Sequence, residues 1–477
     1  MIFLKDTILN KLQSNPVAQQ MLQFGNNIGN LFPNEEALCM ASAFMQDQQT
    51  RIVVKKNRYE AQQLYQRLKP LINDTLLFVM EESLRVQAIA SSPEDKQEQL
   101  YVLTQLVKED KPRIIICNTA AFLRYLPDKE LFKSLCFKFE VDQEITMAEL
   151  KQKLNRAGYT KVNYVDRPCT YASRGGIVDV YCLEYEHPIR IEFFDTVIES
   201  IRLFHEETQR TIQTIDSVLI NPATDLLFTD DQIEYLQKEI DSELEKQQAK
   251  LIQDDYDFLL DYIEKDKISI ENYDIDPHLY IYFSYLNANK LTDYVNGHII
   301  FSSQEEVESG YKKLNEETIS FIQEMVESHQ YLPKYGMFHD IFTFEKEHTI
   351  QMFHDFLDFK HPIFSKIETL EKSDQPLIQI LENLKGENIY ISLDEEHTKK
   401  VQEALKAYSI HRNITFIEDD FYEGFTYEDI SVYTQQELFH HPSQIKRYQK
   451  TFKQGQILQN ILELEPNDYV VHEQYGI

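Results

Sequence analysis

Short runs of β-branched residues alternate with amphipathic stretches in the first part of the chain, and this alternation limits the choice of fold more than any other feature. The runs at 51–56 ("RIVVKK") and 113–118 ("RIIICN") are typical of buried strands. After the first run, "YEAQQLYQRL" places its apolar residues on one helical face. Strands that alternate with helices form parallel sheets, so the sequence predicts an α/β domain. Ligands of such sheets bind at the carboxyl ends of the strands, often at a helix N-terminus.

Length and composition indicate a chain of several domains in a reducing compartment. The 477 residues suggest about three domains. No apolar run reaches the roughly 20 residues that span a bilayer, and the first residues do not resemble an export signal. The cysteines are odd in number and lack CxxC spacing, so we expect reduced thiols in the cytoplasm, with neither disulfides nor a metal site. They are Cys39, Cys117, Cys136, Cys169 and Cys182.

The chain is strongly acidic, and this charge argues against nucleic acid as a direct ligand. It has 48 basic and 79 acidic residues, a formal net charge of −31. Affinity for a duplex comes largely from Lys and Arg, which release its counterions. The richest basic stretch, at 440–454, is short and is interpreted as a linker. We therefore expect protein partners, and no direct DNA binding by these residues.

The middle of the chain has a different pattern. A predicted helix at 146–159 stops at Gly158 and is followed by a β-rich stretch at 164–204, which together indicate a small α+β module. A strongly acidic, helical stretch at 229–285 comes next, and "HIIFSS" at 298–303 is a further strand. The tail from about 331 again alternates strand-like and aromatic-rich pieces. The sequence therefore predicts a second α/β domain near its end.

Two strand-like runs within 173–195 form a predicted hairpin with unlike faces. Period-two alternation places Ile189, Ile191 and Phe193 on one face of the second run, and Arg190, Glu192 and Phe194 on the other. On the first run, Val178, Val180 and Cys182 alternate with Ile177, Asp179 and Tyr181. Aromatic residues and Arg beside complementary charges are typical of a protein–protein contact. From the pattern alone, a solvated face with cross-strand ion pairs and an acid–base pair of Asp179 and Glu192 remain alternatives.

Residues 174–211 resemble one family closely. The stretch "RGGIVDVY…PIRIEFFDTVIESIRLFHEETQRT" is similar to bacterial transcription-repair coupling factors (Mfd), in the module that they share with the excision-repair protein UvrB. The motifs RGGI, R-hydrophobic-EFF, SIR and TQR appear in the family's order. A second stretch, "NDYVVHEQYGI" at 467–477, resembles the start of the family's RNA-polymerase-interacting domain.

The resemblance implies a binding surface for UvrA on the hairpin. The family's contact residues correspond here to Arg174, Asp179, Arg190, Glu192 and Phe194. The preceding loop departs from the family pattern G-E-F-S-x, because this chain has Cys-Thr-Tyr-Ala-Ser at 169–173. The implied fold is a degenerate P-loop-type parallel-sheet domain in two chain segments, with an inserted α+β module and a further α/β domain. The expected boundaries are 1–135 and 206–330 for the two segments, 136–205 for the module, 331–439 for the further domain, 440–464 for a linker, and 465–477 for the start of the polymerase-interacting domain.

The nucleotide site of the family's fold is expected to be inactive here. UvrB carries a GxxGxGKT loop in its first segment, and the corresponding turn here is "GNLFPNEEAL" at 29–38. Pro33 lies in the loop, Glu36 replaces the phosphate-binding Lys, and Ala37 replaces the hydroxyl that binds magnesium. Ser302 and Ser303 stand where the acidic pair would follow a strand. The same residues suit an ordinary helix start, with Asn34 as N-cap and Glu35 and Glu36 facing the helix dipole.

The functional prediction is the amino-terminal, partner-docking part of a transcription-coupled nucleotide excision repair factor. By resemblance, the full-length protein recruits UvrA and displaces stalled RNA polymerase with an ATP-driven DNA translocase further along the chain. The predicted partners are UvrA and, through the domain that begins near Asn467, RNA polymerase; DNA contacts belong to later domains, and no membrane is involved. No catalytic residue or cofactor is expected here, and ATP and magnesium only for the later motor. The alternatives are a freestanding acidic scaffold and an active UvrB-like repair ATPase.

Overall fold

A computed structural model describes residues 4–439 apart from 24–27, 83–92, 274–275, 287, 335, 355–362, 364, 373–374, 411 and 418–420. The chain divides into two units, Met1–Ser443 and Gln444–Ile477. The expected linker at 440–464 and the expected polymerase-interacting start at 465–477 lie outside the described residues. Within the described ranges, no helix is long and apolar enough to cross a membrane.

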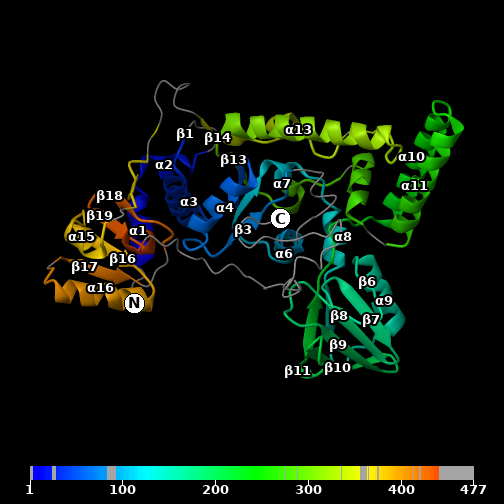
Figure 1. The fold of residues 1–477 in the computed structure, drawn as a ribbon, viewed down its shortest axis with the longest axis horizontal. Helices are drawn as coiled ribbons and strands as arrows, with labels where there is room; N and C mark the ends of the chain where they lie inside the picture. The colour runs from blue at the N-terminus through cyan, green and yellow to red at the C-terminus, as the bar shows by residue number, and fades with distance from the viewer. Residues whose placement is uncertain are drawn as a thin grey trace, which may run out of the picture. The chain divides into compact units, whose positions relative to one another are not determined.

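The first domain is built on a six-stranded sheet in which every described pair of neighbours is parallel (Figure 1). The strand order is β1-β14-β13-β2-β4-β3. This confirms the α/β prediction. The strands are β1 (Ile28–Gly29), β2 (Arg51–Lys55), β3 (Thr75–Phe78), β4 (Ile114–Asn118), β13 (His298–Phe301) and β14 (Ile350–His354).

Helices cover both faces of this sheet. Alternate residues of β2 separate the two layers: Val53 joins one hydrophobic cluster, and Ile52 and Val54 join the other. The Val53 layer holds α1 (Leu4–Leu12), α2 (Pro16–Gln20), α3 (Pro33–Asp47) and α4 (Arg58–Leu68). The opposite layer holds α6 (Pro93–Lys108), α7 (Thr119–Leu123), α8 (Lys129–Ser134), α12 (Leu291–Tyr294), α13 (Gln304–Glu327) and α14 (Ile341–Glu347).

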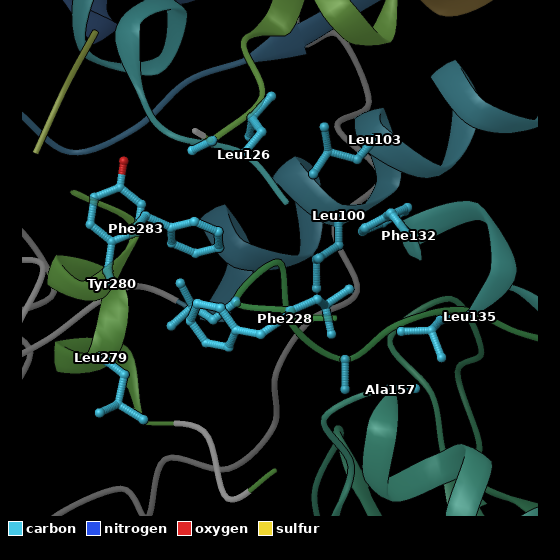
Figure 2. Packing of buried hydrophobic residues seen from close by; sticks show 14 of the residues in the cluster. Leu100, Leu103, Leu126, Phe132, Leu135, Ala157, Phe228, Leu279, Tyr280 and Phe283 are labelled. Carbon is cyan, nitrogen blue, oxygen red and sulfur yellow. The ribbon is translucent and has the colours of Figure 1, made fainter. Parts of the chain in front are cut away.

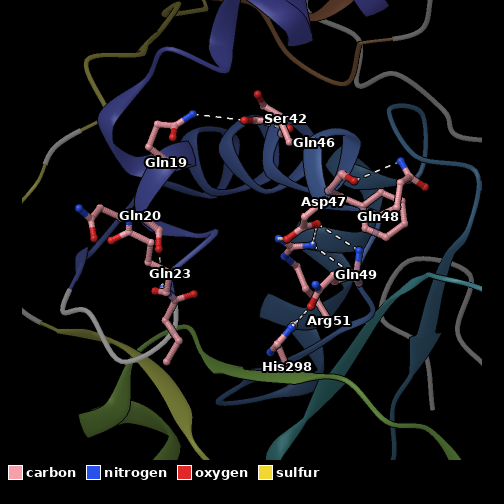
Figure 3. A network of polar contacts seen from close by, with 12 residues as sticks. Gln19, Gln20, Gln23, Ser42, Gln46, Asp47, Gln48, Gln49, Arg51 and His298 are labelled. Carbon is pink, nitrogen blue, oxygen red and sulfur yellow. Dashed lines mark hydrogen bonds and ion pairs between the residues drawn. The ribbon is translucent and has the colours of Figure 1, made fainter.

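The sheet joins two distant chain segments. Strand β13 inserts between β2 and β14, with Ile300 opposite Val53. At the amino ends of these strands, Arg51 donates to both carboxylate oxygens of Asp47 at 2.9 and 2.7 Å, and His298 contacts Gln49 (Figure 3). Strand β14 lies beyond 331, so the second segment is longer than expected. The reason is that β14 completes this sheet by pairing with β1 and β13.

The inserted module is an antiparallel meander packed on one helix. Its sheet has the order β11-β10-β9-β8-β7-β6, and β5 pairs separately with β12. Because β11 and β12 belong to the module, it extends beyond the expected end at 205. Its elements are β5 (Phe137–Glu140), α9 (Met147–Arg156), β6 (Thr160–Lys161), β7 (Thr170–Arg174), β8 (Ile177–Tyr181), β9 (Ile189–Phe194), β10 (Val197–Phe204), β11 (Thr211–Ile215) and β12 (Ser217–Ile220).

The acidic stretch forms two antiparallel helices, α10 (Asp230–Gln248) and α11 (Gln253–Glu271), followed by the 3-10 helix η1 (Pro277–Tyr285). One hydrophobic core joins η1, the base of the module and α6 (Figure 2). There, the rings of Phe228 and Phe283 stack with centroids 5.0 Å apart. Arg124, at the end of α7, forms a buried ion pair of 2.5 Å with Asp225, where the chain leaves the module. The module is thus fixed to the α/β domain at its base.

The last described domain is a mixed five-stranded sheet in the order β15-β18-β19-β16-β17. Phe425 and Val432 join the same cluster as α1 and α3, and Arg67 of α4 pairs with Glu423 at 2.8 Å. The sheet therefore packs on the first domain. Its elements are β15 (Glu368–Thr369), α15 (Leu377–Glu382), β16 (Asn388–Ser392), α16 (Glu395–Ala407), β17 (Ile414–Ile417), β18 (Phe425–Tyr427), β19 (Ile430–Tyr433) and α17 (Gln435–Phe439).

Candidate functional site: a docking face and a filled nucleotide site

The module's sheet has an inner face toward α9 and an outer face, which we call the docking face. Its inner residues are fully buried, as alternation predicted: Val178, Val180, Ile189 and Ile191. The hydroxyl of Tyr171 on this side donates to Asn155 of α9 at 2.7 Å. The docking face carries Ala172, Arg174, Ile177, Asp179, Tyr181, Arg190, Glu192, Phe194, Arg202 and Phe204.

Arg190 lies at the centre of the docking face and is held on three sides. Its guanidinium donates to both oxygens of Asp179, at 2.7 and 2.8 Å, and to Gln209 at 2.7 Å. It also lies over the ring of Phe204, 4.2 Å from the ring centre. The bonds to Asp179 raise the pKa of Arg190 above its usual value. The positive charge of Arg190 is therefore held in place, and its side chain would lose little conformational freedom on binding.

Asp179 lies on the face that the hairpin pattern predicted, but it is buried there. It was expected on the contact surface, but only 3% of the residue is exposed. The reason is the cross-strand pair: Ala172, Asp179 and Arg190 lie opposite one another on β7, β8 and β9, and the larger Arg190 covers the carboxylate. Asp179 thus positions Arg190 and cannot itself form a wide contact.

Glu192 is tied to the next strand. One of its oxygens pairs with Arg202, and the other accepts a hydrogen bond from Ser200 at 2.8 Å. Arg202 was absent from the expected site, although the same alternation along the SIR motif places it opposite Arg190. With both carboxylates of the face engaged by arginines, neither Asp179 nor Glu192 is available as an acid–base pair.

Arg174 and Phe194 are the exposed members of the expected set. The Arg174 side chain is 62% exposed and lies 3.9 Å from Asp179. Phe194 is 75% exposed, next to the turn from β9 to β10. The turn after Arg174 needs a residue with a left-handed backbone, which Gly175 supplies with φ of +56°. These two side chains stand at the ends of neighbouring hairpins and are exposed to solvent.

The loop that departs from the family pattern is built into the module. Cys169 has φ of +62°, its N–H donates to the backbone carbonyl of Tyr181 at 2.8 Å, and its thiol lies 3.6 Å from the carbonyl of Ala223. Burial raises the pKa of this thiol to about 11. All five cysteines are unpaired. Cys169 therefore acts as a packing residue, and no reactive thiol lies at the docking face.

Side chains of the protein itself fill the position where the sequence predicted an inactive nucleotide site. Three residues separate the end of β1 from the start of α3, and Glu36 in the first turn of α3 is 1% exposed. Lys55, at the end of β2, donates to Glu36 at 2.5 Å, and the hydroxyl of Ser302, after β13, donates to it at 2.5 Å. The carboxylate thus occupies the carboxyl edge of the sheet, where this fold class places phosphate.

The other residues of this site have structural roles. Ser303 caps α13, its hydroxyl accepting from the N–H of Glu306 at 3.3 Å, and Ala37 is buried in the helix layer. Pro33 is the first residue of α3, where its missing N–H costs nothing. The expectation that Asn34 caps the helix was wrong, because Phe32 occupies the N-cap position and Asn34 turns inward. In the described ranges, no cluster of His, Cys, Asp and Glu could hold a metal ion.

Comparisons with known proteins agree with the architecture. The model of the UvrB interaction domain matches residues 137–226, which runs from β5 to just beyond β12. The transcription-repair-coupling factor of Bacillus subtilis (strain 168) is 27% identical over 466 residues, which cover 89% of this chain and 39% of that protein. The transcription-repair-coupling factor of Staphylococcus haemolyticus (strain JCSC1435) is 26% identical over 488 residues, which cover 94% of this chain and 41% of that protein. The chain spans about two fifths of the length of these curated relatives.

Proposed function

We propose that this chain, which carries a UvrB interaction domain and is related over most of its length to the transcription-repair-coupling factors, docks the excision-repair protein UvrA during transcription-coupled repair. The observation that carries the proposal is the docking face within the matched domain. Arg174 and Phe194 are exposed there beside the immobilised Arg190. Arg and aromatic side chains dominate the energetics of protein–protein contacts.

The chain acts in this proposal by binding and not by catalysis. The two carboxylates of the docking face are held by arginines, and Glu36 fills the nucleotide site. An ATP-driven motor, with ATP and magnesium as cofactors, would belong to the part of the relatives that this chain does not span. Contacts with RNA polymerase would belong to the domain that begins near Asn467, and contacts with DNA to later domains. The acidic balance of the chain, 79 acidic against 48 basic residues, supports a protein partner.

The proposal is tested by measuring the affinity of the purified chain for UvrA from the same organism by calorimetry. Arg174→Ala and Phe194→Ala should each weaken binding about thirtyfold, the effect of a hot-spot residue that contributes about 2 kcal/mol. Lys161→Ala is the control. Lys161 is an exposed residue of β6, and it pairs with Tyr171, whose side chain faces α9. Absence of UvrA binding by the parent chain would overturn the proposal. Arg174→Ala and Phe194→Ala variants that bind UvrA as tightly as the control Lys161→Ala would overturn it too.

A further inference from the structure

The loop between β6 and β7 lies on the docking face. Val165 of this loop is buried against Ala172 and Phe204, with Val162 and Tyr181 at the border of the cluster. Two hydrogen bonds hold the loop at its ends: Val162 N–H donates to the carbonyl of Tyr171 at 2.8 Å, and the Thr170 hydroxyl donates to the carbonyl of Arg167 at 2.6 Å. The loop is thus packed on the sheet at both valines and presents the residues between them outward.

Tyr164 is the residue that this loop exposes. It is 62% exposed, and its hydroxyl makes no hydrogen bond with the rest of the described chain. Its neighbour Val165 is 1% exposed. A large aromatic side chain is thus held out into solvent by a loop that is itself anchored. The chain has no Trp, so its aromatic anchors for a partner can only be Tyr and Phe.

We infer that Tyr164 is a second aromatic anchor of the docking surface, opposite Phe194 across Arg190, for the same partner. This inference rests on the proposed function. Phe204 connects Arg190 with the loop between β6 and β7. The guanidinium of Arg190 lies over its ring on the docking face, and the same side chain packs with Val165 of the loop. A partner that covers Arg190 on this side therefore meets the loop that presents Tyr164. Little conformational entropy is lost on binding, because both the loop and Arg190 are already fixed.

The charges around Tyr164 indicate the chemistry of the partner's surface. Arg167, on the same loop, is exposed and forms no ion pair with the described residues. The docking face and its loop carry four arginines (Arg167, Arg174, Arg190 and Arg202) and three carboxylates (Asp166, Asp179 and Glu192), and Glu186 and Glu206 lie at the edge of the face near Tyr181. Arg190 and Arg202 are already paired with Asp179 and Glu192. Arg167 and Arg174 are exposed, so the partner's surface should carry carboxylates opposite these two residues and apolar recesses for Tyr164 and Phe194.

The test is the affinity of Tyr164 variants for UvrA, measured beside the Arg174→Ala variant. Tyr164→Ala should weaken binding at least tenfold, and Tyr164→Phe should stay within threefold of the parent, because the ring and not the hydroxyl makes the contact. Tyr164→Gln removes the ring as Tyr164→Ala does, but replaces it with a soluble polar side chain, and it should weaken binding in the same way. Tyr59→Ala is the matched control, since Tyr59 is 68% exposed on α4, outside the module. Thermal melting should be the same for all variants, because these side chains are exposed.

The predicted charge complementarity is tested separately, by the rate of association with UvrA. Arg167→Glu should slow association with UvrA and reduce the dependence of the association rate on salt, while Lys161→Glu, with the same charge change on β6, should do so much less. Binding by the parent that is weakened by Arg174→Ala but unchanged by Tyr164→Ala would overturn this inference and leave the proposed function standing. Equal losses for Tyr164→Phe and Tyr164→Ala would also overturn it. Absence of binding by the parent chain would instead reject the proposed function.

Discussion

Arg190 donates two hydrogen bonds to Asp179, which lies directly opposite it on the neighbouring strand. The pair is enclosed: Phe204 lies under the guanidinium, and the carboxylate is almost fully buried. The central arginine of the docking face is therefore also part of the module's internal structure. Binding and stability can be separated at this face, because Arg174 lacks such an enclosure.

We predict that Arg190→Ala lowers the free energy of unfolding by about 3 kcal/mol, because it leaves the buried carboxylate of Asp179 without its main partner. Arg174→Ala should change stability by less than about 0.5 kcal/mol, as exposed substitutions usually do. Urea denaturation followed by circular dichroism measures both. Arg190→Ala with the stability of the parent would show that Asp179 is compensated in another way.

The ion pair in the filled nucleotide site gives a second prediction. Glu36→Ala should destabilise the chain by about 3–5 kcal/mol, because the ammonium group of Lys55 is left in the sheet edge without its counter-charge. The double variant Glu36→Ala/Lys55→Met should recover part of this loss. Lys56→Ala removes a neighbouring pair with Glu306 that is open to solvent, and should cost at most about 1 kcal/mol. Equal costs for Glu36→Ala and Lys56→Ala in chemical denaturation would refute the role given to burial.

The same site predicts the response to nucleotide. Titration of the chain with magnesium-ATP should give no heat of binding up to millimolar concentrations, because the carboxylate of Glu36 stands where the phosphates would lie and would repel them. ADP and a non-hydrolysable ATP analogue should behave alike. A saturable isotherm in the micromolar range, lost on substitution of Lys55, would contradict this prediction.

A fourth prediction concerns pH and the contact between α11 and η1. The carboxylate of Asp266 accepts hydrogen bonds from His278 and Tyr282, both at 2.7 Å. The bond to Asp266 raises the pKa of His278 above its usual value near 6.5, so folding favours the protonated ring. This stabilisation is complete below the unfolded pKa and disappears as the pH rises through the higher folded pKa.

The corresponding experiment compares the melting temperatures of the parent and His278→Gln between pH 5.5 and 9. The advantage of the parent should be largest at pH 5.5 and should shrink as the pH rises. His329→Gln serves as the control, since His329 makes only a longer contact of 3.4 Å with Asp255. An advantage of the parent that grows with pH would mean that the neutral ring is the stabilising form.

The sequence alone was sufficient to predict the parts of the fold in which apolar residues recur with the period of a strand or a helix. The β-branched runs that became β2 and β4 identified the parallel sheet, and alternation separated Val178 and Ile191 from the docking face. The motif around Arg174 indicated the resemblance to transcription-repair-coupling factors, with which the comparisons agree. Each of these features is local, so that a window of a few residues contains the whole signal.

The remaining features depend on pairing between distant residues. Lys55 meets Glu36, and Ser302 reaches the same carboxylate from 266 positions further along the chain, which no local pattern reveals. The burial of Asp179 depends on Arg190 crossing the strand above it. The end of the first domain was misplaced because β14 looks like any other short strand until its partners β1 and β13 are known.

The late arrival of β13 has a consequence for folding during synthesis. Strand β2 ends at Lys55, and its neighbour β13 begins only at His298, so the nascent sheet waits roughly 10–50 s with one hydrophobic edge unpaired, at about 5–20 residues per second. The module is complete well before then, and the pairing of β5 with β12 brings residues 137 and 220 together. Its early folding shortens the loop that β13 must close, and so lowers the entropy cost of completing the sheet. A defect in the module should therefore appear first as aggregation of the surrounding α/β domain while the chain is still being made.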